Sequence, residues 1–120
     1  MRAFRGPILA VLLLLIGAVA QAGFKEASNA YKSGNYPVAL KEFKRLADNG
    51  DASAQFNLGL MYANGHGVSQ DFQEAMVWYR KAAEQGNAAA QINLGWIYAQ
   101  GQVVTRDFEQ ALAWYRKAAD

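Results

Sequence analysis

Residues 71–87 read DFQEAMVWYRKAAEQGN, and residues 107–120 repeat this stretch in register as DFEQALAWYRKAAD, 36 positions later. The stretches before them also match, with NLGLMYANG at residues 57–65 and NLGWIYAQG at residues 93–101. Self-similarity at a fixed period of this size is typical of stacked helical hairpins. The sequence therefore predicts an all-α fold, a short right-handed α-solenoid of about three antiparallel helix pairs.

Each copy of the repeated stretch has the pattern of an amphipathic helix that begins at an aspartate. Asp71 and Asp107 are good N-caps, and Glu74 and Gln110, three residues on, are expected to complete a capping box. The apolar residues of the first copy recur at positions i, i+3, i+4, i+7 and i+8, which predicts the face that packs. They are Ala75, Trp78, Tyr79, Ala82 and Ala83.

A shorter copy precedes these two, because the same offset pairs Ala39 with Ala75 and Phe43 with Tyr79. Arrays of this kind usually need at least about three units, so we expect modest stability. We expect Trp114→Ala to be less destabilising than Trp78→Ala, because the end unit would be packed on one side only. The predicted repeat domain spans residues 23–120, with units at about 24–50, 51–86 and 87–120.

Residues 1–22 have the composition of a secretory signal peptide. A positive start precedes an apolar run over residues 8–20, and Ala20 to Ala22 form a small-x-small cleavage site. A membrane-spanning helix needs about 20 apolar residues, so a retained anchor is the less favoured alternative. Cleavage near Ala22 would leave Gly23 as the first residue of a periplasmic or secreted bacterial protein.

Charge and cysteine content exclude several kinds of site. Net charge is +2, but without Arg2 and Arg5 of the predicted leader, 10 basic residues face 10 acidic ones. This balance gives no electrostatic footprint for nucleic acid. Because the chain has no cysteine, it has no disulfide and no thiolate metal site. The single histidine, His66, is expected to lie in solvent, so no cofactor, metal or catalytic residue is predicted.

The repeated residues resemble the Sel-one-like repeat, a relative of the tetratricopeptide repeat. The shared pattern is A-x-x-x-LG-x-x-Y-x-x-G…D-x-x-x-A-x-x-WY-x-KAA-x-x-G, and it covers residues 54–86 and 90–120. The resemblance implies helix pairs that stack into a superhelix and hold other proteins or peptides. One departure is Val103, which replaces the linker glycine at position 67 and cannot take a positive φ without strain.

Six residues, three on the first helix of each of the last two pairs, are expected to form the partner-binding face. In tetratricopeptide-like arrays the first helices line the concave groove, and these six point away from the predicted core. Side-chain amides can pair with the backbone of an extended peptide, and exposed tryptophan is enriched among interface hot spots. The alternative is that Leu60 and Trp96 pack between repeats. The six residues are Asn57, Leu60, Asn64, Asn93, Trp96 and Gln100.

The predicted function is an exported scaffold that binds a protein or peptide partner in envelope regulation or assembly, without catalysis. A homodimer through the uncapped C-terminal helix is also expected to be feasible. One alternative is a hydrolase acting on cell-wall or β-lactam substrates, although no nucleophile with an adjacent base is visible. The other is a structural unit that completes a larger repeat array.

Overall fold

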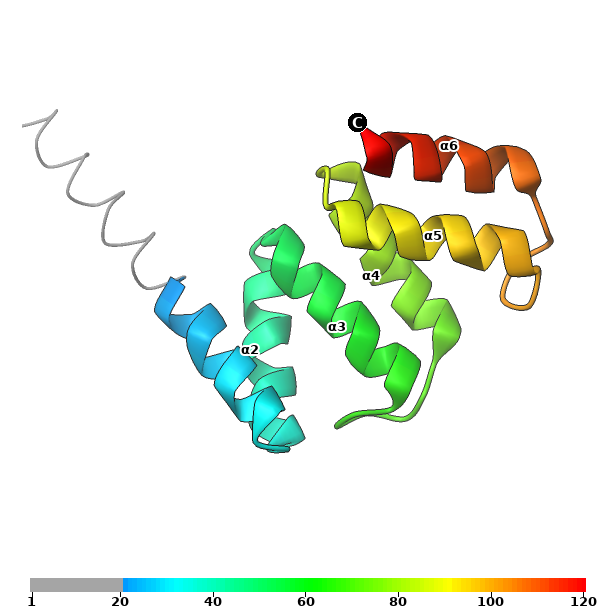
Figure 1. Ribbon diagram of the computed structural model, residues 1–120. Helices are drawn as coiled ribbons and strands as arrows, with labels where there is room; N and C mark the ends of the chain where they lie inside the picture. Colours follow the sequence, from blue (N-terminus) through cyan, green and yellow to red (C-terminus); the bar gives the residue numbers. More distant parts are fainter. Residues whose placement is uncertain (1–20) are drawn as a thin grey trace, which may run out of the picture.

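The computed structural model describes residues 21–120, which form α-helices and no strand, as predicted (Figure 1). All but the last two residues of the predicted signal peptide lie outside this part of the chain. Within it, no helix has the length and apolar character needed to cross a bilayer. The helices are one over residues 21–32, α2 (Tyr36–Asp48), α3 (Ala52–Asn64), α4 (Phe72–Glu84), α5 (Ala88–Gln100) and α6 (Phe108–Ala119).

These helices pair into three hairpins that stack in chain order. The first hairpin contains the helix over residues 21–32 and α2, the second α3 and α4, and the third α5 and α6. Contacts of α2 with α3, and of α4 with α5, join each hairpin to the next. In Figure 1, α3 and α5 lie at the front of the view and α4 passes behind them. The predicted solenoid of helix pairs is thus confirmed.

The helix starts agree with the sequence, except for the return contact of each predicted capping box. The Asp71 carboxylate accepts the backbone N–H of Glu74, and Asp107 accepts that of Gln110, each at 3.0 Å. The predicted capping box is wrong at both helices, because the backbone N–H of Asp71 donates to the carbonyl of Tyr62 at 2.8 Å and that of Asp107 donates to the carbonyl of Tyr98 at 3.0 Å. The Glu74 carboxylate accepts the indole N–H of Trp78 at 3.2 Å. Glu74 therefore holds a core side chain instead of closing the helix end.

Two apolar clusters fill the interfaces between the hairpins. Between the first and second hairpins, Phe43 and Leu58 pack with Trp78. Between the second and third, Tyr79 and Leu94 pack with the second tryptophan of the repeat, Trp114. Each tryptophan therefore packs backward, onto the hairpin that precedes its own.

Trp114→Ala was expected to be less destabilising than Trp78→Ala because the end unit would be packed on one side only. The observed packing shows that this reason is wrong. The side chain of Trp114 is 7% exposed and that of Trp78 is 6% exposed, because both face backward. The tyrosine that follows each tryptophan faces forward instead. Tyr79 is 3% exposed beneath the third hairpin, whereas its counterpart Tyr115 is 38% exposed.

The connection between α3 and α4 packs against the first hairpin. His66 is half-buried, and its Nδ1 atom lies 2.9 Å from the Tyr31 hydroxyl in a hydrogen bond. Its ring also stacks on Tyr36, with centroids 4.3 Å apart and an interplanar angle of 3°. The expectation of a solvated histidine is therefore wrong, and His66 fastens this connection to the first hairpin.

Candidate partner-binding surfaces

The two apolar members of the predicted partner-binding face have different surroundings. Leu60 is half-buried and packs against the second cluster. For Leu60 the structure therefore confirms the alternative prediction, that the side chain packs between repeats. Trp96, at the equivalent position of α5, is 53% exposed. Because Leu60 is covered by the third hairpin, the exposure of Trp96 reflects its position on the last described hairpin.

The four amide residues of the predicted face are also unequal. Asn57 is half-buried and donates its amide to a backbone carbonyl one turn earlier, at 2.8 Å. Asn93 is half-buried and hydrogen-bonds the side chain of Tyr79. Asn64 and Gln100 are exposed. Two of the four amides therefore have partners inside the protein, and binding through the six residues remains a prediction.

A broader apolar surface, here called the end face, covers the outer side of the third hairpin. Four of its large side chains are Ile92, Trp96, Leu112 and Tyr115, which are 50%, 53%, 48% and 38% exposed. The residues 36 positions before them all belong to or pack against the second cluster. These are Phe56, Leu60, Met76 and Tyr79. Aligning the repeats identifies these four as equivalent positions, but the alignment does not show which of them another hairpin covers.

Tyr79 lies on the face of the second hairpin that the third hairpin covers, and the pKa of its side chain is shifted. Burial raises the pKa of the Tyr79 phenol from 10.0 to about 12, while its hydrogen bond with Asn93 acts in the opposite direction. Loss of water around the phenolate is the cause, because a low-dielectric site disfavours the charged form. The raised pKa agrees with the burial of this face under the third hairpin.

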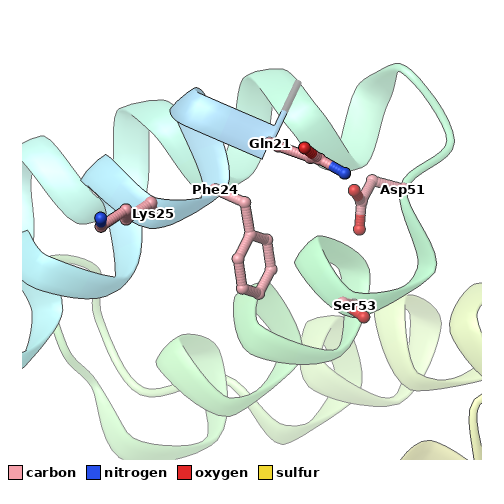
Figure 2. A pocket seen from close by; sticks show the side chains of 5 residues that line it. All are labelled: Gln21, Phe24, Lys25, Asp51 and Ser53. Atoms are coloured by element: carbon pink, nitrogen blue, oxygen red, sulfur yellow. The ribbon is translucent and has the colours of Figure 1, made fainter. Parts of the chain in front are cut away.

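A pocket of 260 Å³ lies where the first helix meets the start of α3 (Figure 2). Phe24 and Lys25 line one side, and Asp51 and Ser53 line the other. The Asp51 carboxylate accepts the backbone N–H of Ala54 at 2.9 Å, as the N-cap of α3. The ring of Phe24 packs edge-on against Phe43 in the first core. Helix capping therefore explains Asp51, and packing explains Phe24.

Within residues 21–120, no cluster of His, Cys, Asp and Glu could hold a metal ion. His66 is hydrogen-bonded to Tyr31, and no serine of the described part of the chain forms a hydrogen bond with it.

The Sel1 repeat family matches residues 52–87 and again residues 88–120, which together exceed half of the chain. This chain belongs to the Sel1 repeat family. The two matched segments coincide with the second and third hairpins, and the Sel-one-like resemblance is thus confirmed. The shorter first hairpin precedes the matched segments.

Solved Sel1 repeat structures share this architecture. A Sel1 repeat protein from Oxalobacter formigenes is 43% identical, with a TM-score of 0.67 over 69% of this chain and 34% of its own. A protective antigen present in uropathogenic Escherichia coli strains, displaying an SLR fold, is 41% identical. Its TM-score is 0.77 over 83% of this chain and 22% of its own.

A curated relative is similar over a shorter stretch. The DAP3-binding cell death enhancer 1 of Rattus norvegicus is 37% identical over 46 residues, which are 38% of this chain and 9% of that protein. The present chain thus spans about a third or less of each of these relatives.

Proposed function

We propose that this chain is an exported scaffold that binds a protein partner through its repeat surface and carries no catalytic activity of its own. The observation that carries the proposal is the end face. There Ile92 and Trp96 lie one turn apart on α5 and are about half exposed, and Leu112 and Tyr115 of α6 are also exposed. Contiguous exposed apolar side chains mark interaction sites on soluble proteins.

Exposed amide side chains on the first helices also support a scaffold function. Asn64 and Gln100 at the carboxyl ends of α3 and α5 leave exposed amides along the row of first helices. An interface needs apolar anchors with a polar rim, and Trp96 followed one turn later by Gln100 offers both. The partner is therefore expected to bury Trp96.

The site of action that we propose is the bacterial cell envelope or the medium outside it. The support is the leader-like composition of residues 1–22, which predicts export and cleavage near Ala22. In that compartment the absence of cysteine from the sequence leaves the fold independent of the redox state. Fractionation of cells that express the full chain tests this, since a cytoplasmic protein with its leader intact would refute it.

Site-specific photo-crosslinking tests partner binding directly. A photoreactive amino acid is placed at position 96 in one variant and at the exposed residue Lys41 of α2 in the control. We expect a discrete protein adduct from position 96 and none from position 41. The same pattern of adducts from both positions, or no adduct from either, would refute the proposed binding surface.

A further inference from the structure

The packing face of the first helix begins at Gly23. This residue is buried, and the next one, Phe24, packs edge-on against Phe43 of α2 with ring centroids 5.6 Å apart. The two residues before Gly23 are also helical, but Gln21 and Ala22 are exposed to solvent. Gly23 is therefore a packing position inside the helix and not its first residue.

Position 23 has no room for a side chain, because α2 lies against it. A Cβ atom there would be 2.5 Å from Nη2 of Arg45 and 3.7 Å from Cδ2 of Leu46. Standard bond lengths then place the backbone nitrogen of Gly23 within about 5 Å of the same Nη2 atom. Any charge on this nitrogen would therefore lie close to a guanidinium group.

Cleavage after Ala22 would turn this nitrogen into a free α-amine, which is mostly protonated at neutral pH. Arg45 already pairs with Glu42 at 3.0 Å, so one carboxylate would face two cations. The packing residues Gly23 and Phe24 would also become the end of the chain, where order is lost first. A mature protein that begins at Gly23 is thus poorly matched to the first hairpin.

A chain that begins at Gln21 avoids this crowding at Arg45. Its α-amine belongs to an exposed residue, two positions before the close contact. The Gln21 side chain lines the pocket at the start of α3 and points toward Asp51 (Figure 2). Exposed Gln21 and Ala22 then occupy the end that frays, and the packing face stays inside the helix.

The sequence contains a cleavage signal at the matching place. Ala18 and Ala20 are small residues separated by Val19, which is the same small-x-small pattern as that of Ala20 and Ala22. Residues 18–20 lie outside the part of the chain that the structure describes, and the signal is read from their sequence alone. The two signals are equivalent as sequence patterns, and the packing of Gly23 favours the earlier one.

We propose that the leader is removed after Ala20, which makes Gln21 the first residue of the mature protein. The assignment rests on the proposed function, because only an exported chain meets a leader peptidase. Water hydrolyses the peptide bond, leaving a carboxylate on Ala20 and an amine on Gln21. Leader removal precedes folding, so the fold does not direct the peptidase. The retained Gln21 and Ala22 reflect what the folded first helix needs.

Intact-mass spectrometry of the full chain, expressed in a bacterium and purified from its periplasm, tests the proposal. We expect the mass of residues 21–120, or that mass less one molecule of ammonia where the N-terminal glutamine has cyclised. A periplasmic protein with the mass of residues 23–120 would overturn this proposal and leave the proposed export standing. A cytoplasmic protein with its leader intact would refute both.

Two matched variants separate the cleavage signals, because each changes a small residue that only one signal uses. Ala22→Phe alters the later signal, and the mature protein should still begin at Gln21. Ala18→Phe alters the earlier signal, and it should block processing or shift the N-terminus to Gly23. The reverse pattern, with processing impaired in Ala22→Phe and normal in Ala18→Phe, would overturn the proposal.

Any product of Ala18→Phe that begins at Gly23 also tests the physical reason. Its unfolding midpoint should be lower than that of the wild-type mature protein by about 2–5 °C, because its α-amine lies beside Arg45. The control is Ala22→Phe, whose exposed substitution should leave the midpoint nearly unchanged. Equal midpoints for the Gly23 product and the wild type would contradict the role assigned to Gln21 and Ala22.

Discussion

The ring of Tyr79 on α4 lies directly against the backbone of Gly59 on α3. A Cβ atom at position 59 would be 2.6 Å from Tyr79 Cε1 and 3.2 Å from the carbonyl oxygen of Ala75. The glycine inside this helix is therefore explained by close approach of the neighbouring helix. The same relationship recurs in the third hairpin between Gly95 and Tyr115.

Alanine at these two glycines should have different effects. In Gly59→Ala the new methyl group meets a buried ring that has nowhere to move, so we expect a loss of about 1–3 kcal/mol. In Gly95→Ala the facing ring of Tyr115 is exposed and can turn away, while helix propensity improves by about 1 kcal/mol. Urea unfolding of both variants measures the difference, and equal losses would show that the ring of Tyr115 is also fixed.

The raised pKa of Tyr79 predicts a loss of stability in alkali. Because the folded-state pKa of about 12 lies above the ordinary value of 10.0, the neutral phenol is favoured by folding. This contribution is complete below pH 10 and is lost as the pH rises toward 12. The fall in unfolding free energy over this range should be shallower in Tyr79→Phe. An unchanged pH dependence in that variant would assign the loss to other groups.

The two tryptophans differ in their hydrogen bonding. The indole N–H of Trp78 reaches Glu74, whereas that of Trp114 is buried with no acceptor within residues 21–120. Gln110 stands where Glu74 stands in the second hairpin. We expect Gln110→Glu to supply the acceptor and to raise the unfolding free energy by about 1 kcal/mol.

The reciprocal change Glu74→Gln is the matched control for this prediction. It should lower the free energy of unfolding, because a carboxylate accepts the indole N–H more strongly than an amide does. Thermal and urea unfolding of both variants provide the measurement. If Gln110→Glu has no effect while Glu74→Gln destabilises, the Trp114 indole already has a partner, such as bound water.

His66 should contribute to stability through the first hairpin. His66→Gln installs the residue found at the equivalent position 102 and removes the stacking on Tyr36, with an expected loss of about 1–2 kcal/mol. Gln102→His in the exposed connection of the third hairpin is the control and should change stability by less than about 0.5 kcal/mol. Similar small effects of both changes would show that the His66 contacts add little.

Much of the fold could be predicted from sequence because the repeat presents each helix more than once. The stripe on α4 and the caps at Asp71 and Asp107 follow from local patterns. A helical wheel gives the face on which a residue lies, but it does not give the direction along the stack. For this reason Trp114 was expected to be more weakly packed, although its ring faces backward and is buried.

The candidate site was harder to predict for a related reason. Leu60 and Trp96 occupy one repeat position, yet only Leu60 has a hairpin packed over it. The environment of His66 depends on Tyr31 and Tyr36, which lie in a different hairpin and carry no local signal. Contacts between units are tertiary, so periodicity identifies the positions involved without showing which partner covers them.

The account depends on a linear stack in which each hairpin is covered by the next and the end face is open. Comparing Tyr79→Ala with Tyr115→Ala by urea unfolding tests this most directly, because the two residues differ mainly in that cover. We predict a loss of about 3–5 kcal/mol for Tyr79→Ala and of no more than about 1 kcal/mol for Tyr115→Ala. Equal losses for the two variants would contradict an open end face.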